Sequence, residues 1–128
     1  MPRNVFIFHG TAGYPGENWF PWMREKLEGE GCNVHVPQFP TPQGQSLAAW
    51  LEVFKGYEQH VDAGSIFIGH SLGGVFLLRL LERFQQPVSA AFFTGTPIGV
   101  LPLKNFASDS SFSGFEFNWS AIRVAAKR

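Results

Sequence analysis

The sequence predicts an α/β fold, in which a parallel sheet is flanked by helices. Short apolar runs recur along the chain, and the first of them, residues 5–8, is continuous rather than alternating, which is typical of a strand buried on both faces of a parallel sheet. Segments with apolar residues at helical spacing separate these runs, and strands that alternate with helices are joined by right-handed crossovers. The length of 128 residues and the 45% hydrophobic content indicate a single domain over residues 1–128.

The first predicted strand covers residues 5–8, all of which are apolar. A glycine-rich loop follows at residues 9–16, and a helix is then expected over about residues 18–30. Asn18 is the expected N-cap, Pro21 lies in the first turn, where proline is tolerated, and Gly31 ends the helix. The loop therefore lies at the carboxyl end of a strand, which is where parallel sheets bind ligands.

The second predicted strand is short, at residues 34–36, and ends before Pro37. Further prolines predict an extended loop, after which Ser46 is expected to cap a second helix. The apolar residues of that helix fall at helical spacing: Leu47, Trp50, Leu51 and Phe54.

The third predicted strand, residues 65–68, leads through a glycine-rich turn into a third helix over residues 72–84. A fourth strand is expected over residues 88–94, beginning at Val88 and ending at Thr94. Residues 95–114 are rich in Ser, Gly and Pro and are expected to be irregular. Residues 120–127 carry a last helical pattern.

Composition and charge exclude several kinds of partner. Ten basic and ten acidic residues cancel, and no basic patch occurs, so neither nucleic acid nor a membrane surface is an expected partner. The first apolar run is too short for a signal peptide, and no run approaches membrane-spanning length. Cys32 is the only cysteine and is expected to be a buried thiol rather than a nucleophile. These features predict a soluble, cytoplasmic protein.

A Gly-x-Ser-x-Gly string at residues 69–73 joins the third strand to the third helix. In α/β-hydrolases this string forms the nucleophile elbow, a turn so tight that the serine backbone is strained and the hydroxyl projects into the cleft. Gly69 and Gly73 lack the Cβ atoms that would collide in such a turn. Ser71 is therefore predicted to be the catalytic nucleophile of a serine hydrolase.

Two other interpretations of this turn remain open. The string can be an ordinary tight turn in which Ser71 only caps the following helix. A phosphate-binding loop is the other alternative, but the Gly-Lys-[Ser/Thr] ending that such a loop needs is absent.

A serine hydrolase also needs two N–H groups that point at the developing oxyanion. Leu72, directly after the nucleophile, is expected to supply one of them, and Thr11 in the loop after the first strand is the best candidate for the other. Gly10, Tyr14 and Trp19 are candidates to line a substrate cleft. The alternatives are an ordinary connection for the loop and core packing for Trp19.

Stretches along the whole chain resemble the small bacterial YdeN-type serine hydrolases, which are related to the retinoblastoma-binding serine hydrolase. Besides residues 69–73 and the second helix, the matching stretches are Val-Phe-Ile-Phe-His-Gly at 5–10, Asn-Trp-Phe-Pro-Trp at 18–22, Val-His-Val-Pro-Gln-Phe-Pro at 34–40 and Phe-Glu-Phe-Asn-Trp-Ser-Ala-Ile-Arg at 115–123. The resemblance implies a three-layer α/β-hydrolase with strand order 2-1-3-4. It also implies hydrolysis of a small ester or amide, with no cofactor and no metal.

The other members of a catalytic triad are missing from these residues. In this fold the order along the chain is Ser, then Asp or Glu, then His, but no histidine follows Ser71. The resident histidines are all expected to be structural or solvated: His9, His35, His60 and His70. Asp109 is expected to be a solvated loop residue. The chain is therefore interpreted as a C-terminally truncated, partial hydrolase domain that is weakly active or inactive.

Two alternatives to a weak enzyme stay open, namely a non-catalytic pseudo-hydrolase that binds a ligand or partner, and a fragment without function. The strand at residues 88–94 would lie at the edge of the sheet and is apolar, uncharged and free of proline. Such an edge favours pairing with another chain. We expect it either to pair across a homodimer or to be covered by residues 95–128 folding back.

Overall fold

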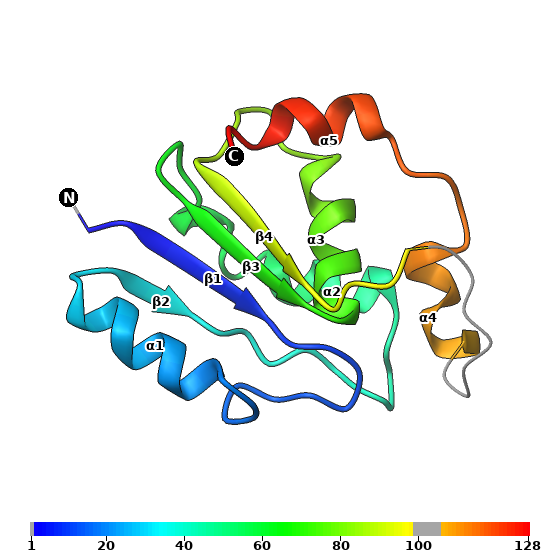
Figure 1. Cartoon of the computed structure of the whole chain (residues 1–128). Coiled ribbons are helices and arrows are strands. Elements are labelled where there is room, and N and C mark those ends of the chain that lie inside the picture. The colour runs from blue at the N-terminus through cyan, green and yellow to red at the C-terminus, as the bar shows by residue number, and fades with distance from the viewer. Residues whose placement is uncertain (1, 99–105) are drawn as a thin grey trace.

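The computed structural model describes residues 2–98 and 106–128, and it contains a four-stranded parallel sheet (Figure 1). Its strands lie in the order β2-β1-β3-β4, which confirms the predicted order 2-1-3-4. Their bounds are β1 Asn4–Phe8, β2 Asn33–His35, β3 Ile66–His70 and β4 Ala90–Thr94. The α/β class and the parallel sheet that the sequence predicts are thus both present.

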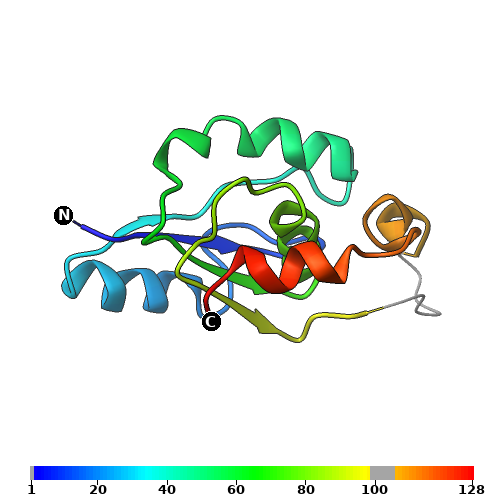
Figure 2. The same ribbon diagram turned by 90° about the horizontal axis from the view of Figure 1, so that it is seen from above.

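Helices cover both faces of this sheet, as Figure 2 shows from above. One face is covered by α1 alone, and the other by α2 and α3, which gives the predicted three layers. The helix bounds are α1 Phe20–Gly29, α2 Leu47–Phe54, α3 Leu72–Leu81, α4 Phe106–Ser113 and α5 Trp119–Ala125, with one 3-10 turn at Glu58–His60.

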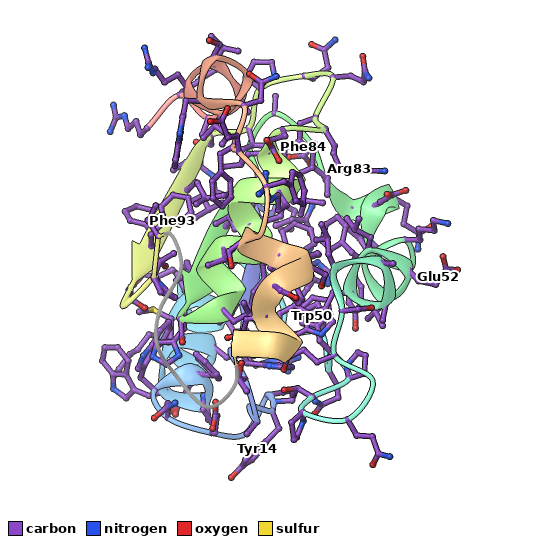
Figure 3. All side chains as sticks on the ribbon, turned by 90° about the vertical axis from the view of Figure 1, so that its right-hand side faces the viewer. Tyr14, Trp50, Glu52, Arg83, Phe84 and Phe93 are labelled. Atoms are coloured by element: carbon purple, nitrogen blue, oxygen red, sulfur yellow. The ribbon has the colours of Figure 1, made fainter. Side chains whose placement is uncertain are left out.

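Alternate residues of each strand enter the two hydrophobic clusters. In β1, Val5 and Ile7 face α1, while Phe6 and Phe8 face α2 and α3. The α2–α3 side is dominated by aromatic rings, among which Phe39 stacks on Trp50 with centroids 4.5 Å apart (Figure 3 marks Trp50). The large phenylalanine content thus fills one side of the sheet.

Two predicted helix caps can be compared with the structure. Ser46 does cap α2, since its hydroxyl accepts a hydrogen bond from the Ala49 N–H at 3.0 Å. Asn18 is not the N-cap of α1, because it adopts a left-handed conformation with φ 51° and the helix starts later, with Trp19 at the cap position. Asparagine tolerates that conformation better than most residues, which explains its place in the turn.

The prediction of an irregular segment at residues 95–114 is wrong at its end, where α4 forms. Long-range contacts explain this helix. Phe112 is fully buried against Trp50, with ring centroids 5.0 Å apart, and Ser111 Oγ accepts a hydrogen bond from the Leu47 N–H. Tertiary packing therefore overrides the weak helix propensity of a serine-rich stretch.

The outer edge of β4 is partly covered by the last residues of the chain. Val88, just before β4, forms a parallel bridge with Ala126, and the Ala91 N–H donates to the Arg128 carbonyl oxygen at 2.9 Å. The expected folding back of residues 95–128 thus occurs at the start of the strand. Phe92 and Phe93 remain 53% and 40% exposed, and the homodimer stays a prediction.

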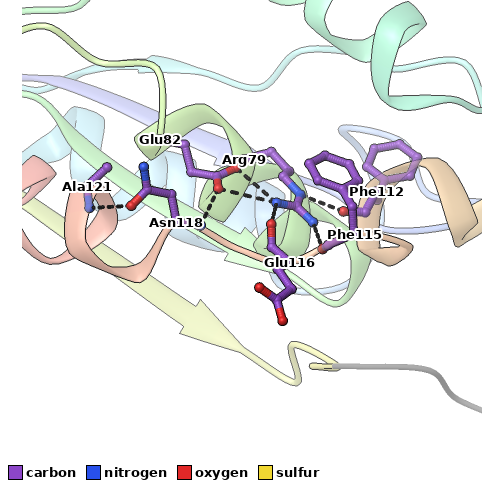
Figure 4. A network of polar contacts seen from close by, with 7 residues as sticks. All are labelled: Arg79, Glu82, Phe112, Phe115, Glu116, Asn118 and Ala121. Carbon is purple, nitrogen blue, oxygen red and sulfur yellow. Dashed lines mark hydrogen bonds and ion pairs between the residues drawn. The ribbon is translucent and has the colours of Figure 1, made fainter.

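Arg79 of α3 ties the C-terminal segment to the body of the molecule (Figure 4). Its side chain is only 2% exposed and donates to the Glu82 carboxylate and to the carbonyl oxygens of Phe112, Phe115 and Glu116. The guanidinium also lies 3.5 Å from the ring centroid of Phe115. This buried cation fixes the path of the chain between α4 and α5.

Candidate active site

Ser71 lies alone between the end of β3 and the start of α3, at the carboxyl edge of the sheet. Its backbone has φ 55° and ψ −124°, a conformation that costs free energy for any residue with a side chain. Only three non-glycine residues of the described chain have positive φ, the others being Ala12 and Asn18. The backbone strain expected at a nucleophile elbow is therefore observed at the predicted residue.

The glycines around Ser71 lie where a Cβ atom would clash with neighbouring atoms. A Cβ atom on Gly69 would lie 2.6 Å from the Gly74 Cα atom, and one on Gly73 would lie 2.3 Å from the Phe8 carbonyl oxygen. A Cβ atom on Gly74 would overlap Thr96 Oγ1 at 1.8 Å. The turn can therefore be this tight only because β3, β1 and the start of α3 meet without side chains.

The loop after β1 lies directly beside Ser71. A Cβ atom on Gly10 would be 2.9 Å from the Ser71 Cβ atom and 3.3 Å from Ser71 Oγ. The loop turns back at once, because the Gly13 N–H donates to the Gly10 carbonyl oxygen at 3.0 Å. The two glycine-rich segments that the sequence places at the carboxyl edge are thus in contact.

Some of the backbone N–H groups near Ser71 donate hydrogen bonds within the protein, and others do not. The Ser71 N–H donates to the Thr94 carbonyl oxygen at 2.9 Å. Within residues 2–98 and 106–128, neither the Thr11 N–H nor the Leu72 N–H has an acceptor. Both predicted oxyanion donors are thus unoccupied, and Leu72 also lies at the positive end of the α3 dipole.

His9 has a structural role and does not face Ser71 as a base. It is fully buried, its Nδ1 lies 2.9 Å from the Gly10 carbonyl oxygen, and its Nε2 accepts from the Phe39 N–H at 2.9 Å. Burial lowers the pKa of His9 below its ordinary value of 6.5, with weaker opposing effects from Gly10 and Glu17. Both ring nitrogens are therefore engaged in holding the loop after β1.

The remaining histidines also lie away from a base position. His35 stacks on His60 at 4.8 Å beside β2, which β1 separates from the elbow, and burial is the main cause that lowers the pKa of His35. The His70 ring packs against Trp19 and Phe20 of the α1 side, at 5.9 and 5.8 Å. Its Nδ1 is buried without a hydrogen-bond partner among the residues that the structure describes.

The predicted cleft residues occupy different environments. Tyr14 is 53% exposed and projects from the loop away from the body of the molecule (Figure 3). Trp19 is half-buried and packs edge-on against Phe20 at 4.7 Å. Gly10 alone of these candidates is shown next to Ser71, so the cleft role of Tyr14 and Trp19 stays a prediction.

Asp109 is not the solvated loop residue that the sequence predicts. It belongs to α4, and its carboxylate accepts a hydrogen bond from Gln45 Nε2 at 2.6 Å. Gln45 and Thr41 are not predicted from the sequence to have a role, although both side chains hydrogen-bond to the loop after β1. No motif marks these two residues, because only the fold shows that they meet this loop.

Among the described residues, no group of three or more His, Cys, Asp or Glu side chains is placed to hold a metal ion. In the same part of the chain, no helix combines the length and the apolar character needed to cross a bilayer.

Comparison with known proteins identifies the family. The family model described as serine hydrolase matches residues 5–115, which include the elbow and the loop after β1. The chain belongs to the serine hydrolase family. Among curated proteins, it is 31% identical over 85 residues to the putative hydrolase YdeN of Bacillus subtilis, and 31% identical over 87 residues to the serine hydrolase RBBP9 of Rattus norvegicus.

These two alignments each cover 66% of the chain, but only 45% of YdeN and 46% of RBBP9. The chain thus spans about half the length of the curated relatives it matches. The crystal structure of the ydeN gene product superposes with a TM-score of 0.89 at 24% identity, over 98% of this chain and 68% of that one. A pyrethroid hydrolase from Sphingobium faniae JZ-2 superposes with a TM-score of 0.63 at 18% identity, over 80% of this chain and 43% of that one. Both confirm the fold.

Proposed function

We propose that the chain carries the nucleophilic half of an ester-hydrolysing site, with Ser71 as the attacking residue. The observation that carries this proposal is the strained Ser71 backbone at the start of α3, with Gly10 packed against its side chain. In an acyl transfer, Ser71 Oγ would bond to the carbonyl carbon of the substrate. The N–H groups of Thr11 and Leu72 would receive the resulting oxyanion.

The proton of the Ser71 hydroxyl needs an acceptor during this attack. No histidine nitrogen is hydrogen-bonded to Ser71 Oγ in the described part of the chain. We therefore expect the 128 residues alone to hydrolyse esters slowly. Esters with good leaving groups are favoured over amides, because an amine must be protonated before it leaves.

A fluorophosphonate probe tests the proposal directly. Ser71 Oγ would form a bond to phosphorus, fluoride would leave, and the hydroxyl proton would pass to water. We expect slow labelling of the wild type and no labelling of Ser71→Ala. The matched control is Ser120→Ala, which removes an exposed hydroxyl of α5 and should be labelled like the wild type. Labelling that survives in Ser71→Ala would refute the proposal.

Ester turnover provides a second measurement with the same variants. For p-nitrophenyl acetate, we expect at most about a 10³- to 10⁴-fold acceleration over uncatalysed hydrolysis, which is what a site retains when triad members are missing. Rapid hydrolysis that disappears in Ser71→Ala would contradict the expected absence of a base.

A ligand-binding module without catalysis is the second candidate. The observation that favours it is that both His9 nitrogens are already bonded and that no histidine of the described residues is hydrogen-bonded to Ser71. This candidate predicts no labelling of Ser71 under conditions in which an unreactive ester analogue still binds.

We also propose a reducing, cytoplasmic location. Cys32 is the only cysteine of the sequence and is a half-buried free thiol beside α1 and β2, so an internal disulfide does not contribute to this fold.

A further inference from the structure

The side-chain amide of Gln45 connects three segments around the candidate site. Gln45 lies just before α2 and is only 8% exposed, which is unusual for a glutamine. Its amide group bonds to the loop after β1, to Thr41 of its own loop and to Asp109 of α4. A buried polar group with partners on three segments fixes their relative positions.

The directions of these hydrogen bonds are mutually consistent. Gln45 Nε2 donates to Asp109 Oδ1 at 2.6 Å and to Thr11 Oγ1 at 3.3 Å. Its Oε1 accepts from the Thr41 hydroxyl, and Thr41 Oγ1 in turn accepts from the Ala12 N–H at 2.7 Å. Because a carboxylate can only accept, the NH₂ group must face Asp109, and the orientation of the amide is fixed.

These bonds end on the two residues that follow Gly10. Thr11 is held through its hydroxyl, and Ala12 through its N–H in a left-handed conformation with φ 61°. Gly10 packs against Ser71, so the orientation of the Thr11 peptide group relative to Ser71 depends on how this turn is anchored.

We propose that Gln45 is a positioning residue that aims the Thr11 N–H at the oxyanion and couples this donor to α4. This inference rests on the proposed function, in which Thr11 is an oxyanion donor. A second hydrogen bond, from the Leu47 N–H to Ser111 Oγ at 3.0 Å, holds α4 against the start of α2 beside Gln45. Movement of α4 is thereby transmitted to the turn at Thr11.

The donor and the acceptor of the hydrogen bond between Gln45 and Asp109 can be exchanged by substitution. Gln45→Glu keeps acceptors for the Thr41 and Thr11 hydroxyls but places a carboxylate against that of Asp109. The added change Asp109→Asn supplies an amide donor on the opposite side, so the bond forms again in the reverse direction. A residue that only fills space would show no such dependence on the partner.

The experiment measures the rate of Ser71 labelling by a fluorophosphonate in the full chain. We expect Gln45→Leu and Gln45→Glu to slow labelling by about 10-fold or more, since misplaced donors cost at least this much. Gln43→Leu, the matched control on an exposed glutamine of the same loop, should label like the wild type. Gln45→Glu/Asp109→Asn should recover most of the loss. Unchanged labelling in Gln45→Leu, or no recovery in the double variant, would overturn the inference.

Amide hydrogen exchange separates failure of this inference from failure of the proposed function. In Gln45→Leu, which removes the acceptor of the Thr41 hydroxyl, we expect faster exchange at Ala12, by about 10-fold or more, with the amides of β1 and β3 unchanged. If the wild type is not labelled at all, the proposed function fails, and exchange at Ala12 still decides whether Gln45 anchors the turn. Unchanged exchange at Ala12 would refute the anchoring role.

Discussion

At the residue scale, the elbow depends on positions where no side chain fits. Gly73→Ala would place a methyl group 2.3 Å from the Phe8 carbonyl oxygen and 2.5 Å from that of His9, both of which belong to backbone that cannot rotate away. We expect a loss of about 2–4 kcal/mol in the free energy of unfolding, measured by urea denaturation.

Gly29→Ala is the matched control for this prediction. Gly29 ends α1 with nothing within 4 Å of its added Cβ atom, so alanine should be neutral or stabilise the helix by up to about 1 kcal/mol. Equal effects of the two substitutions would contradict the steric account of the elbow.

The buried imidazole of His9 predicts a pH dependence of stability. Because burial lowers the pKa of folded His9 below 6.5, the unfolded state binds more protons between that value and the folded pKa. Stability should therefore be complete above pH 6.5 and decrease as the pH falls through the folded pKa. His35, whose pKa is also lowered, contributes in the same direction.

The change His9→Gln tests this contribution, since glutamine keeps an acceptor for the Phe39 N–H but does not titrate. We expect stability to fall less steeply below pH 6.5 than in the wild type, as measured by denaturation at several pH values. Identical slopes in the two proteins would show that His9 does not take part.

Sequence reasoning reached some residues of the site and missed others for physical reasons. Ser71 and its glycines were predictable, because steric limits on a tight turn act locally and leave a recognisable string. The position of Gln45 in the site could not be predicted, since it depends on a hydrogen bond to Asp109, which lies 64 positions away in the chain. For the same reason, the sequence does not show that Asp109 is bonded rather than solvated.

At the element scale, the join between α3 and the C-terminal segment depends on Arg79. Removing the guanidinium takes the arginine donor from three carbonyl oxygens and leaves the Glu82 carboxylate with the Asn118 N–H as its remaining donor. We expect Arg79→Met to lower the free energy of unfolding by about 3–5 kcal/mol. Arg83→Met, on an exposed arginine of the same region, should change stability by less than about 0.5 kcal/mol.

Limited proteolysis would show whether the Arg79 effect is local. We expect Arg79→Met to be cut faster between α4 and α5, where Phe115 and Glu116 lose their hydrogen bonds, than within α1. Uniform cleavage along the chain would indicate a general loss of stability instead.

The elements also show where sequence patterns suffice. The strands β1 and β3 could be predicted because continuous apolar runs mark strands that are covered on both faces, and the sheet order followed from the resemblance. The helix α4 could not be predicted, since residues 106–113 have little intrinsic preference for a helix. It depends on the burial of Phe112 against Trp50, a contact between distant segments.

At the scale of the whole molecule, the exposed half of β4 favours association. The last residues of the chain cover the edge at Val88 and Ala91, while Phe92 and Phe93 remain 53% and 40% exposed on the strand (Figure 3 marks Phe93). We predict a homodimer that pairs through this edge, detectable by analytical ultracentrifugation.

A charged residue on the edge should prevent that pairing. We expect Phe93→Lys to be monomeric, whereas Trp22→Lys, on an exposed aromatic residue of α1, should leave the dimer intact. A wild-type chain that sediments as a monomer at all concentrations would contradict the prediction.

Gly10 packs so closely against Ser71 that position 10 leaves no room for a side chain. A single methyl group there would lie 2.9 Å from the Ser71 Cβ atom and 3.3 Å from its hydroxyl oxygen, so the serine or the loop after β1 would have to shift. Of all the glycines near the elbow, Gly10 is thus the one whose replacement would press directly on the serine side chain.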